Sequence, residues 1–333
     1  MTSAVWCSAR RGPCWNAAGN CVAVPGALFY GRAVITFPPA GTEAEFDALT
    51  RQDLLPAVRS LGFGEAVPFT EGSLPVYAVG DDLVLKLFPP VHLGEFPTER
   101  TMLEVLHGKL PIPTPAVHDA GERDGWGYVL MERLRGETLK DAWPSLSTED
   151  KHRLAPELGE ALAALHSLRD PRLDVLGPPD WATFVAEQRA KVVEHHRRTG
   201  LDEKWIAQVP AFLDSVALGS PPAVPLHTEF MRDHLMVSHD GGRPRLTGLF
   251  DFEPAMRGAA EYDFVAVGLF VSGGDKDFLQ RLLTGYGIEP DEGFSRRCLA
   301  YALLHVYSNF TWYLGILPAP EEPTLESLSR AWW

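Results

Sequence analysis

Residues 227–234 read HTEFMRDH, and residues 249–253 read LFDFE. In the first stretch Glu229 comes two residues after His227, and a further potential ligand, His234, follows five residues after Glu229. In the second stretch Asp251 directly follows two apolar residues that are typical of a strand. An acidic residue at the end of such a strand, close to a loop of this composition, indicates a functional site.

A third stretch, GAAEYDF at residues 258–264, follows closely. Together the three stretches resemble the aminoglycoside phosphotransferase family, a branch of the protein-kinase-like fold. Its members carry H-G-D-x-x-x-x-N, a strand ending in I-D-[WF]-[ED], and then G-D-P-x-Y-D-[LF]. Gly258, Tyr262 and Asp263 match the third motif, whereas Ala259-Ala260 replaces its Asp-Pro.

Two of the three key residues of the catalytic loop depart from the family motif. Glu229 stands where the family has Asp, and His234 stands where it has Asn. The resemblance extends over roughly residues 43–315 and is most specific over 226–264. It implies phosphoryl transfer, with either altered or lost chemistry at the two changed positions.

The resemblance implies an α+β, bilobal protein-kinase-like fold, with a small strand-rich N-lobe and a larger, mostly helical C-lobe. We expect the N-lobe, with its nucleotide-binding sheet and helix, over residues 42–134, and the helical C-lobe over residues 135–333. Residues 1–41 show no clear period and match nothing in the family, so we expect an unstructured or mis-assigned N-terminal extension there.

Local patterns predict the individual elements. Short apolar runs bounded by turn residues predict strands at 66–69, 76–79, 83–88, 116–118 and 128–131. Apolar residues at helical spacing predict helices at 42–61, 97–106, 181–198, 205–213, 278–286 and 295–314. Ser147 opens a capping-box signature for one more helix, and Pro156 is expected to kink its first turns or to mark its true start.

Lys86 is the first candidate for nucleotide binding. Strand alternation places it on one face with Val84 and Phe88, and a lysine on an apolar face needs an anionic partner. The resemblance implies that Lys86 holds the nucleotide phosphates and pairs with Glu99, for which Glu104 is the rival. The alternative is an exposed lysine whose ammonium group reaches water.

Two weaker signals complete the expected ATP site. Residues 69–74 (FTEGSL) stand where the family has its phosphate-covering loop, and Ser73 is the candidate residue there, although an ordinary hairpin turn fits equally well. Residues 131–134 (MERL) resemble the hinge between the lobes, where the adenine edge would meet backbone groups of Glu132 and Leu134.

Asp251 is the strongest metal-ligand candidate, since Mg²⁺ prefers oxygen ligands and bridges phosphate oxygens. Glu253 follows on the same strand face and is a candidate supporting residue. His234 is a candidate second ligand, yet neutral imidazole favours Zn²⁺ and similar metals over Mg²⁺. The alternatives for His234 are donation to a phosphate or a plugged site, with Asp233 supplying the missing oxygen if the loop shifts by one residue.

The resemblance implies that Glu229 acts as the base or as the residue that orients the acceptor hydroxyl. A carboxylate is retained there, but the extra methylene moves it by about one bond length, and a misplacement of about 1 Å reduces rates by ~10²-fold. His227, the second candidate of the catalytic loop, is expected to hold that loop through backbone hydrogen bonds. Asp263 is expected to brace it.

Composition narrows the partners. The 333-residue chain has a formal charge of −14, which disfavours nucleic acid, and no run of 18 apolar residues that would indicate a membrane span. An acidic chain attracts cations, so a cationic small molecule is a candidate substrate. The four cysteines show no C-x-x-C pair. Free thiols in a reducing cytoplasm fit them best, with secretion as the minor alternative.

Two clusters of polar residues have a structural and a functional interpretation. His195-His196 resembles a metal site, but an end to a helix is favoured because imidazolium stabilises the helix dipole. Acidic residues of the C-lobe are candidates for binding a cationic substrate, with a solvated surface as the favoured alternative. These are Asp275, Asp277, Glu289, Asp291 and Glu292.

The family resemblance implies ATP- and Mg²⁺-dependent phosphorylation of a hydroxyl on a small molecule, with an aminoglycoside-like alcohol as one candidate. One alternative is a nucleotide-binding pseudokinase that acts through interactions. Another is a choline- or homoserine-type kinase of the same fold, because the fold does not determine the substrate.

Overall fold

The computed structural model describes residues 35–239 and 242–333. The chain divides into two units, Met1–Thr36 and Phe37–Trp333, and every element described below belongs to the second. The predicted extension at 1–41 therefore falls largely outside the described residues.

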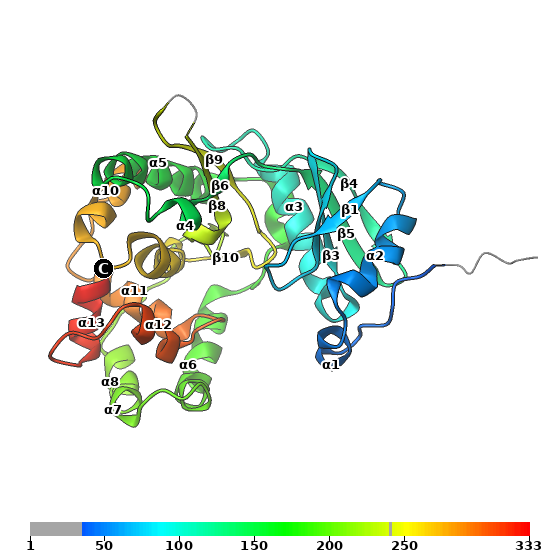
Figure 1. The fold of residues 1–333 in the computed structure, drawn as a ribbon. Helices are drawn as coiled ribbons and strands as arrows, with labels where there is room; N and C mark the ends of the chain where they lie inside the picture. The colour runs from blue at the N-terminus through cyan, green and yellow to red at the C-terminus, as the bar shows by residue number, and fades with distance from the viewer. Residues whose placement is uncertain (1–34, 240–241) are drawn as a thin grey trace, which may run out of the picture. The chain divides into compact units, whose positions relative to one another are not determined.

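An antiparallel five-stranded sheet forms the core of the N-lobe (Figure 1), with the strand order β1-β2-β3-β5-β4. The strands are β1 (Ala66–Pro68), β2 (Val76–Val79), β3 (Leu83–Phe88), β4 (Val117–Arg123) and β5 (Trp126–Glu132). In the register of this sheet Lys86 lies opposite Val76 on β2 and Val129 on β5. This puts Lys86 on a central strand, which confirms the strand predicted at 83–88.

Three helices accompany the sheet: α1 (Glu43–Asp47), α2 (Arg51–Ser60) and α3 (Phe96–Leu106), with a 3-10 helix η1 (Pro90–Glu95) before α3. The single helix predicted over 42–61 is wrong. Thr50 begins a new helix, because its Oγ1 accepts a hydrogen bond from Asp53 N (3.2 Å) while the Asp53 carboxylate accepts one from Thr50 N (2.9 Å).

The ordered N-lobe begins before the predicted boundary at residue 41. Phe37 and Ala40 are buried, and Phe37 stacks on Trp126 with ring centroids 5.4 Å apart. Trp126 Nε1 donates to Pro38 O (2.8 Å), and Phe37 N donates to the Asp124 carboxylate (3.1 Å). Residues 37–40 are therefore part of the lobe, since their backbone and side chains are held by β5 and the turn before it.

The C-lobe is mostly helical. Its α-helices are α4 (Leu139–Ala142), α5 (Thr148–Ser167), α6 (Trp181–Arg198), α7 (Glu203–Ile206), α8 (Val209–Asp214), α9 (Phe264–Ala266), α10 (Lys276–Tyr286), α11 (Phe294–Leu304), α12 (Phe310–Ile316) and α13 (Leu325–Trp332). The 3-10 helices are η2 (Pro171–Val175), η3 (Arg232–His234) and η5 (Ala260–Tyr262), and a π-helix, η6, spans Val267–Ser272.

Several predicted helices need correction. The helices predicted at 205–213 and 295–314 are each two helices, α7 with α8 and α11 with α12, and α13 was not predicted. Pro156 neither starts α5 nor ends it. The helices α5 and α10 pack at backbone distance, because a Cβ on Gly159 would lie 2.0 Å from Leu282 O. Pro156 takes part in this contact through its backbone, against Gly285.

Two small sheets position the catalytic segment. One has the order β6-β8-β9, formed by Glu137–Thr138, Leu235–Ser238 and Arg245–Leu249, and the other pairs β7 (Val224–Leu226) with β10 (Met256–Gly258). Residues 227–234 connect β7 to β8, and Asp251 follows the end of β9. The two motifs therefore meet because β8 and β9 are antiparallel neighbours, with Leu235 opposite Leu249.

Among the described residues, no helix combines the length and the apolar character that a membrane crossing requires.

Candidate active site

Lys86 lies at the junction of the two lobes and is buried, with 5% of its surface exposed. Its Nζ forms ion pairs with the carboxylates of Asp251 and Glu253, and lies 3.6 Å from Glu99 Oε2 on α3. The rival Glu104 pairs instead with Arg100 on the exposed side of α3, at 2.8 Å. The structure thus brings Lys86, Glu99 and Asp251 together as predicted, and adds Glu253 to the direct partners of Lys86.

One ammonium group faces three carboxylates in this cluster. Burial alone would lower the pKa of Lys86, but Asp251, Glu99 and Glu253 together raise it well above its usual value. Burial raises the pKa of Glu253 to about 8 despite the opposing effect of Lys86, and burial likewise raises the pKa of Glu99. The carboxyl groups of Glu99 and Glu253 therefore tend to retain a proton beside the single ammonium group, and an added cation would compete for that place.

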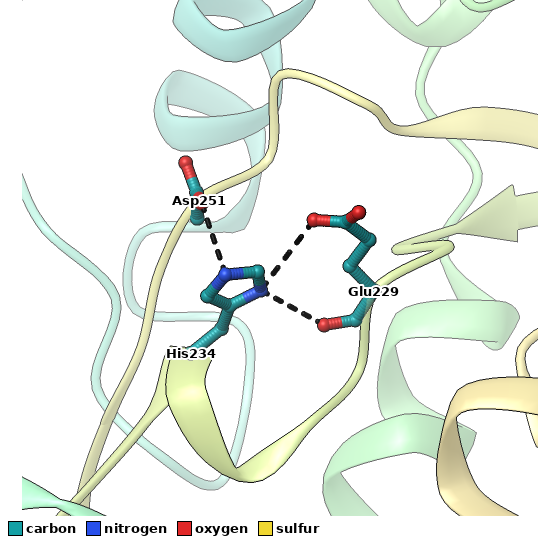
Figure 2. A group of neighbouring side chains, drawn as sticks. All are labelled: Glu229, His234 and Asp251. Carbon is teal, nitrogen blue, oxygen red and sulfur yellow. Dashed lines mark hydrogen bonds and ion pairs between the residues drawn. The ribbon is translucent and has the colours of Figure 1, made fainter. Parts of the chain in front are cut away.

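Asp251 belongs to a second group with Glu229 and His234 (Figure 2). His234 Nε2 lies 3.1 Å from Asp251 Oδ2, while His234 Nδ1 lies 3.0 Å from the backbone oxygen of Glu229 and 3.9 Å from Glu229 Oε2. Burial raises the pKa of Asp251, but Lys86 and then His234 outweigh burial and lower it below its usual range. Asp251 is therefore ionised and shared by both groups.

Asp263 braces the catalytic loop from behind. Its carboxylate accepts hydrogen bonds from the backbone N of His227 (2.9 Å) and of Thr228 (2.6 Å), and it also contacts His166 Nε2 of α5 at 2.8 Å. Thr228 has φ +67°, a conformation that L residues rarely adopt. The family has Gly at this position, and here the hydrogen bond from Thr228 Oγ1 to Pro254 O (3.1 Å) adds support.

His227 is completely buried, and burial lowers its pKa to about 4, so the ring is neutral at pH 7. Its Nε2 donates to Phe250 O at 3.1 Å, which ties the catalytic loop to the segment before Asp251. This contact agrees with a role in holding the loop. Asp233 pairs with Lys140 of α4 at 2.6 Å, so in this structure its carboxylate does not replace His234 beside Asp251.

The segment predicted to cover phosphates has a support that the sequence did not reveal. The guanidinium of Arg51, the first residue of α2, donates to the carbonyl oxygens of Glu71 (3.1 Å), Leu74 (3.2 Å) and Gly72. Gly72 has φ +93°, which suits glycine. Because Arg51 fixes three carbonyl groups around Ser73, it restricts the conformation of the whole loop.

At the predicted hinge, one of the backbone groups is already engaged. Glu132 N donates to Ala116 O at 2.8 Å. The adenine contact predicted for Glu132 would therefore have to use its carbonyl oxygen. The side chain of Leu134 packs on Gly248, where a Cβ would lie 2.3 Å from Leu134 Cδ1, so this part of the hinge rests directly on β9.

The remaining polar clusters have structural partners. His195 Nε2 and His196 Nε2 contact the backbone oxygens of Ser308 (2.6 Å) and Leu303 (3.0 Å) near the end of α6. The predicted helix end is confirmed, but burial lowers the pKa of His196 to about 4, so this ring does not act there as an imidazolium. In the acidic cluster, Asp275 caps α10, Asp277 pairs with Arg281, and Asp291 pairs with Arg297. These contacts account for three of the five acidic residues without a ligand.

A sequence model of the phosphotransferase enzyme family matches residues 65–299, more than two thirds of the chain. The chain belongs to this family. A homoserine kinase of Paraburkholderia phymatum is 28% identical over 232 residues, which cover 63% of this chain and 68% of that protein. This phosphotransferase also resembles solved structures in its fold, among them the GDP complex of aminoglycoside 2′-phosphotransferase-IIIa, with a TM-score of 0.65 and 18% identity over 79% of this chain and 94% of that one.

A second structure, the GDP and kanamycin complex of APH(2″)-IIIa, gives a TM-score of 0.62 with 21% identity over 72% of this chain and 83% of that one. Together these similarities confirm the predicted family and the bilobal kinase-like fold. The family match begins at residue 65, so Arg51 and helix α2 lie outside it.

Proposed function

We propose that this phosphotransferase transfers the terminal phosphoryl group of a nucleoside triphosphate to a hydroxyl of a small molecule. The observation that carries the proposal is the meeting of Lys86, from the N-lobe sheet, with Asp251 and Glu253 of the C-lobe. A buried lysine with a helix glutamate and an acidic residue after a strand is the arrangement that kinase-like folds use around nucleotide phosphates.

The nucleotide would lie between the lobes. Lys86, oriented by Glu99, would contact its phosphates, and the loop around Ser73 would cover them with backbone N–H groups. The carbonyl of Glu132 and the N–H of Leu134 would meet the adenine edge. Phosphate oxygens would then compete with Asp251 and Glu253 for the ammonium of Lys86.

The site fits Mg²⁺ or another divalent cation in its charge and its donors. Apart from ion pairs with Lys86, Glu99 Oε2 and Glu253 Oε2 are buried and accept no hydrogen bond from the residues that the structure describes. Asp251 and Glu253 would hold the cation, since both carboxylates follow β9. When bound, such a cation neutralises charge that develops on the phosphate oxygens.

Glu229 would orient the acceptor hydroxyl and receive its proton. Burial raises the pKa of Glu229, which makes the carboxylate a better proton acceptor than an exposed one. As the hydroxyl oxygen bonds to the γ-phosphorus, its proton passes to Glu229, and the bond from γ-phosphorus to the bridging oxygen breaks. The nucleoside diphosphate leaves with that electron pair.

We place the acceptor beside Glu229, near the loop between α11 and α12. This loop holds Tyr307 and helix α12 holds Tyr313, and the charge of Glu229 adds to burial in raising the pKa of both to about 12. Tyr307 is 53% exposed and thus accessible to a ligand. The similarity to a homoserine kinase favours a small amino alcohol as acceptor, and the fold similarity makes aminoglycosides the second class to test.

The test begins with nucleotide binding. Calorimetric titration of the protein with ATP and GTP, with and without Mg²⁺ or Mn²⁺, should show metal-dependent binding. Phosphoryl transfer is then followed by release of the nucleoside diphosphate over a panel that contains L-homoserine, choline, kanamycin and simple amino alcohols. Absence of nucleotide binding would end the proposal. Binding without turnover of any acceptor would favour the pseudokinase alternative.

A further inference from the structure

We propose that His234 is an imidazole ligand of the divalent-metal site at Asp251, and that this site therefore prefers first-row transition metals such as Mn²⁺, Co²⁺ and Zn²⁺ to Mg²⁺. This inference deepens the proposed function because it concerns the cation of the same site. It differs from the expectation for the family, in which an Asn oxygen stands at the position of His234.

The hydrogen bonds of His234 determine which ring nitrogen faces the site. Nδ1 lies 3.0 Å from the backbone oxygen of Glu229, and a carbonyl oxygen only accepts, so Nδ1 carries the proton. The lone pair of a neutral ring is therefore on Nε2, which lies 3.1 Å from Asp251 Oδ2. Two acceptors at this distance repel each other unless a proton or a metal ion lies between them, and we assign that place to a metal ion.

The distance fits two ligands of one ion. Metal–nitrogen and metal–oxygen bonds of about 2.1 Å at a right angle place the two ligand atoms about 3.0 Å apart. A histidine that binds a metal commonly donates its other N–H to a backbone carbonyl, which fixes the tautomer, and His234 Nδ1 already does so. The arrangement is thus that of a metal ligand with its supporting hydrogen bond in place.

Packing fixes the orientation of the imidazole. The ring stacks on His227 with centroids 5.9 Å apart and an interplanar angle of 19°, and its other neighbour is Phe250 with centroids 5.8 Å apart. Figure 2 shows the ring between the carboxylate groups of Glu229 and Asp251. Side chains that are already held in place lose little freedom when an ion binds.

The two oxygens of Asp251 face different neighbours. Oδ1 pairs with Lys86, whereas Oδ2 faces His234. The Glu229 carboxylate lies near the other ring nitrogen, with its Oε2 3.9 Å from His234 Nδ1. An ion at Oδ2 therefore leaves the ion pair between Asp251 and Lys86 intact, and its remaining positions stay open to water or phosphate oxygens.

The chemistry of this donor set determines the preference. Sites with only carboxylate and carbonyl oxygens suit Mg²⁺, whereas imidazole nitrogen increases affinity for transition metals, in an order that rises from Mn²⁺ to Co²⁺. We therefore expect metal-free protein, titrated calorimetrically without nucleotide, to bind Mn²⁺ and Co²⁺ at least about 10-fold more tightly than Mg²⁺. Bound Co²⁺ should also give a visible absorption band.

His234→Asn provides the decisive comparison, because it restores an oxygen donor. It should weaken Co²⁺ binding by about 10- to 100-fold, the range that metal sites show when histidine orientation or ligation is lost. It should leave Mg²⁺ affinity within about threefold and change the Co²⁺ band. His152→Asn is the matched control, since His152 Nε2 also lies beside a carboxylate, 3.4 Å from Asp277, and this change should alter neither metal affinity nor the band.

Two outcomes would overturn the proposal. Equal Mg²⁺ and Co²⁺ affinities that His234→Asn does not change would show that the nitrogen is not a ligand. No binding of any of these metals at millimolar concentration would show that His234 and Asp251 form an ion pair only. Metal selectivity that depends on His234, combined with no phosphoryl transfer to any alcohol, would leave this inference standing while the proposed function fails.

Discussion

The two halves of the candidate site are built differently. The N-lobe half consists of Lys86 and Glu99, whose side chains are 6% and 1% exposed. The loop half consists of Glu229 and His234, whose side chains are 28% and 13% exposed. The N-lobe half keeps the residues expected for kinase-like folds, and the loop half contains both departures. Nucleotide binding and phosphoryl transfer should therefore be separable by substitution, with Asp251 as the residue that both halves share.

Asp251→Asn should have the largest effect, because Asp251 contacts both Lys86 and His234. Loss of its charge removes a metal ligand and a partner of Lys86 together. We expect kcat/KM to fall by about 10³-fold, equivalent to roughly three steps of 1.36 kcal/mol in transition-state stabilisation. Steady-state kinetics with the best acceptor provides the measurement, and circular dichroism checks the fold. A decrease of less than about tenfold would mean that Asp251 is not central to the site.

Glu229→Gln keeps the shape of the side chain and removes its charge. We expect kcat to fall by about 10²-fold, the scale of a positioned acid–base group, while the Kd for ATP changes by less than about threefold. Glu229→Asp is the control, because it shortens the side chain but retains the carboxylate. If Glu229→Gln weakens ATP binding as much as it slows turnover, the two halves do not act separately.

Lys86→Met tests the N-lobe half. The substitution keeps a long side chain but leaves Glu99, Asp251 and Glu253 without their ammonium partner. We expect the Kd for ATP to rise by about 10-fold, equivalent to about 1.4 kcal/mol. We also expect the protein to become less stable, because breaking a buried ion pair leaves the remaining carboxylates without a countercharge, so that they repel one another. Combining Lys86→Met with Glu253→Gln should recover part of the stability but not the affinity. Recovery of both would assign the affinity loss to misfolding.

Arg51→Met tests a residue of the N-lobe that lies outside the family-matched residues 65–299. Loss of the hydrogen bonds that Arg51 Nη2 shares among the carbonyls of Glu71, Gly72 and Leu74 should loosen the loop around Ser73. We expect the Kd for ATP to rise by about three- to fivefold. Each net hydrogen bond contributes about 1 kcal/mol to the fixed conformation of the loop, and ATP binding requires only part of that conformation. Arg59→Met, on the exposed end of the same helix, is the control. Equal effects of the two changes would reject a role of Arg51 in the loop.

The pH dependence of stability should show the smallest effect. The folded-state pKa of Glu253 is raised to about 8, above the ordinary value of 4.5, so the folded state binds the proton more tightly. Its stabilisation is complete below about pH 4.5 and is lost as pH rises towards about 8. Metal-free protein should thus show a Tm that falls by a few degrees between about pH 5.5 and 8. Glu253→Gln should flatten this decrease, and an unchanged slope would contradict the raised pKa.

The sequence predicted those parts of the site that depend on strand direction and motif spacing. Strands 76–79 and 83–88 have the predicted bounds. The alternation of residues along the second strand correctly predicted that Lys86 is on the same side as Phe88 and buried. The spacing of the two motifs placed Glu229, His234 and Asp251 together, because the intervening chain is an antiparallel pair of strands. Their roles remain predictions.

Features that depend on non-local contacts or on the balance between two local signals were missed. Apolar periodicity continues through 42–61, but the capping hydrogen bonds of Thr50 begin a separate helix. Arg51 has the appearance of an exposed helix residue, and nothing in its neighbours indicates that it reaches carbonyl groups 20 residues away. The burial of Phe37 likewise requires Trp126, which is distant in sequence.

Asp263 links the formation of the site to the folding of the C-lobe. Its carboxylate joins the catalytic loop, 35 and 36 residues earlier, to His166 on α5, 97 residues earlier. Contacts between segments so far apart require the loop-closure entropy of the intervening chain to be overcome, which makes them slow to form in folding. The catalytic loop therefore cannot reach its geometry as an early local structure, and its positive φ at Thr228 is maintained only by the assembled lobe. Catalytic competence in this protein is a property of the completed fold.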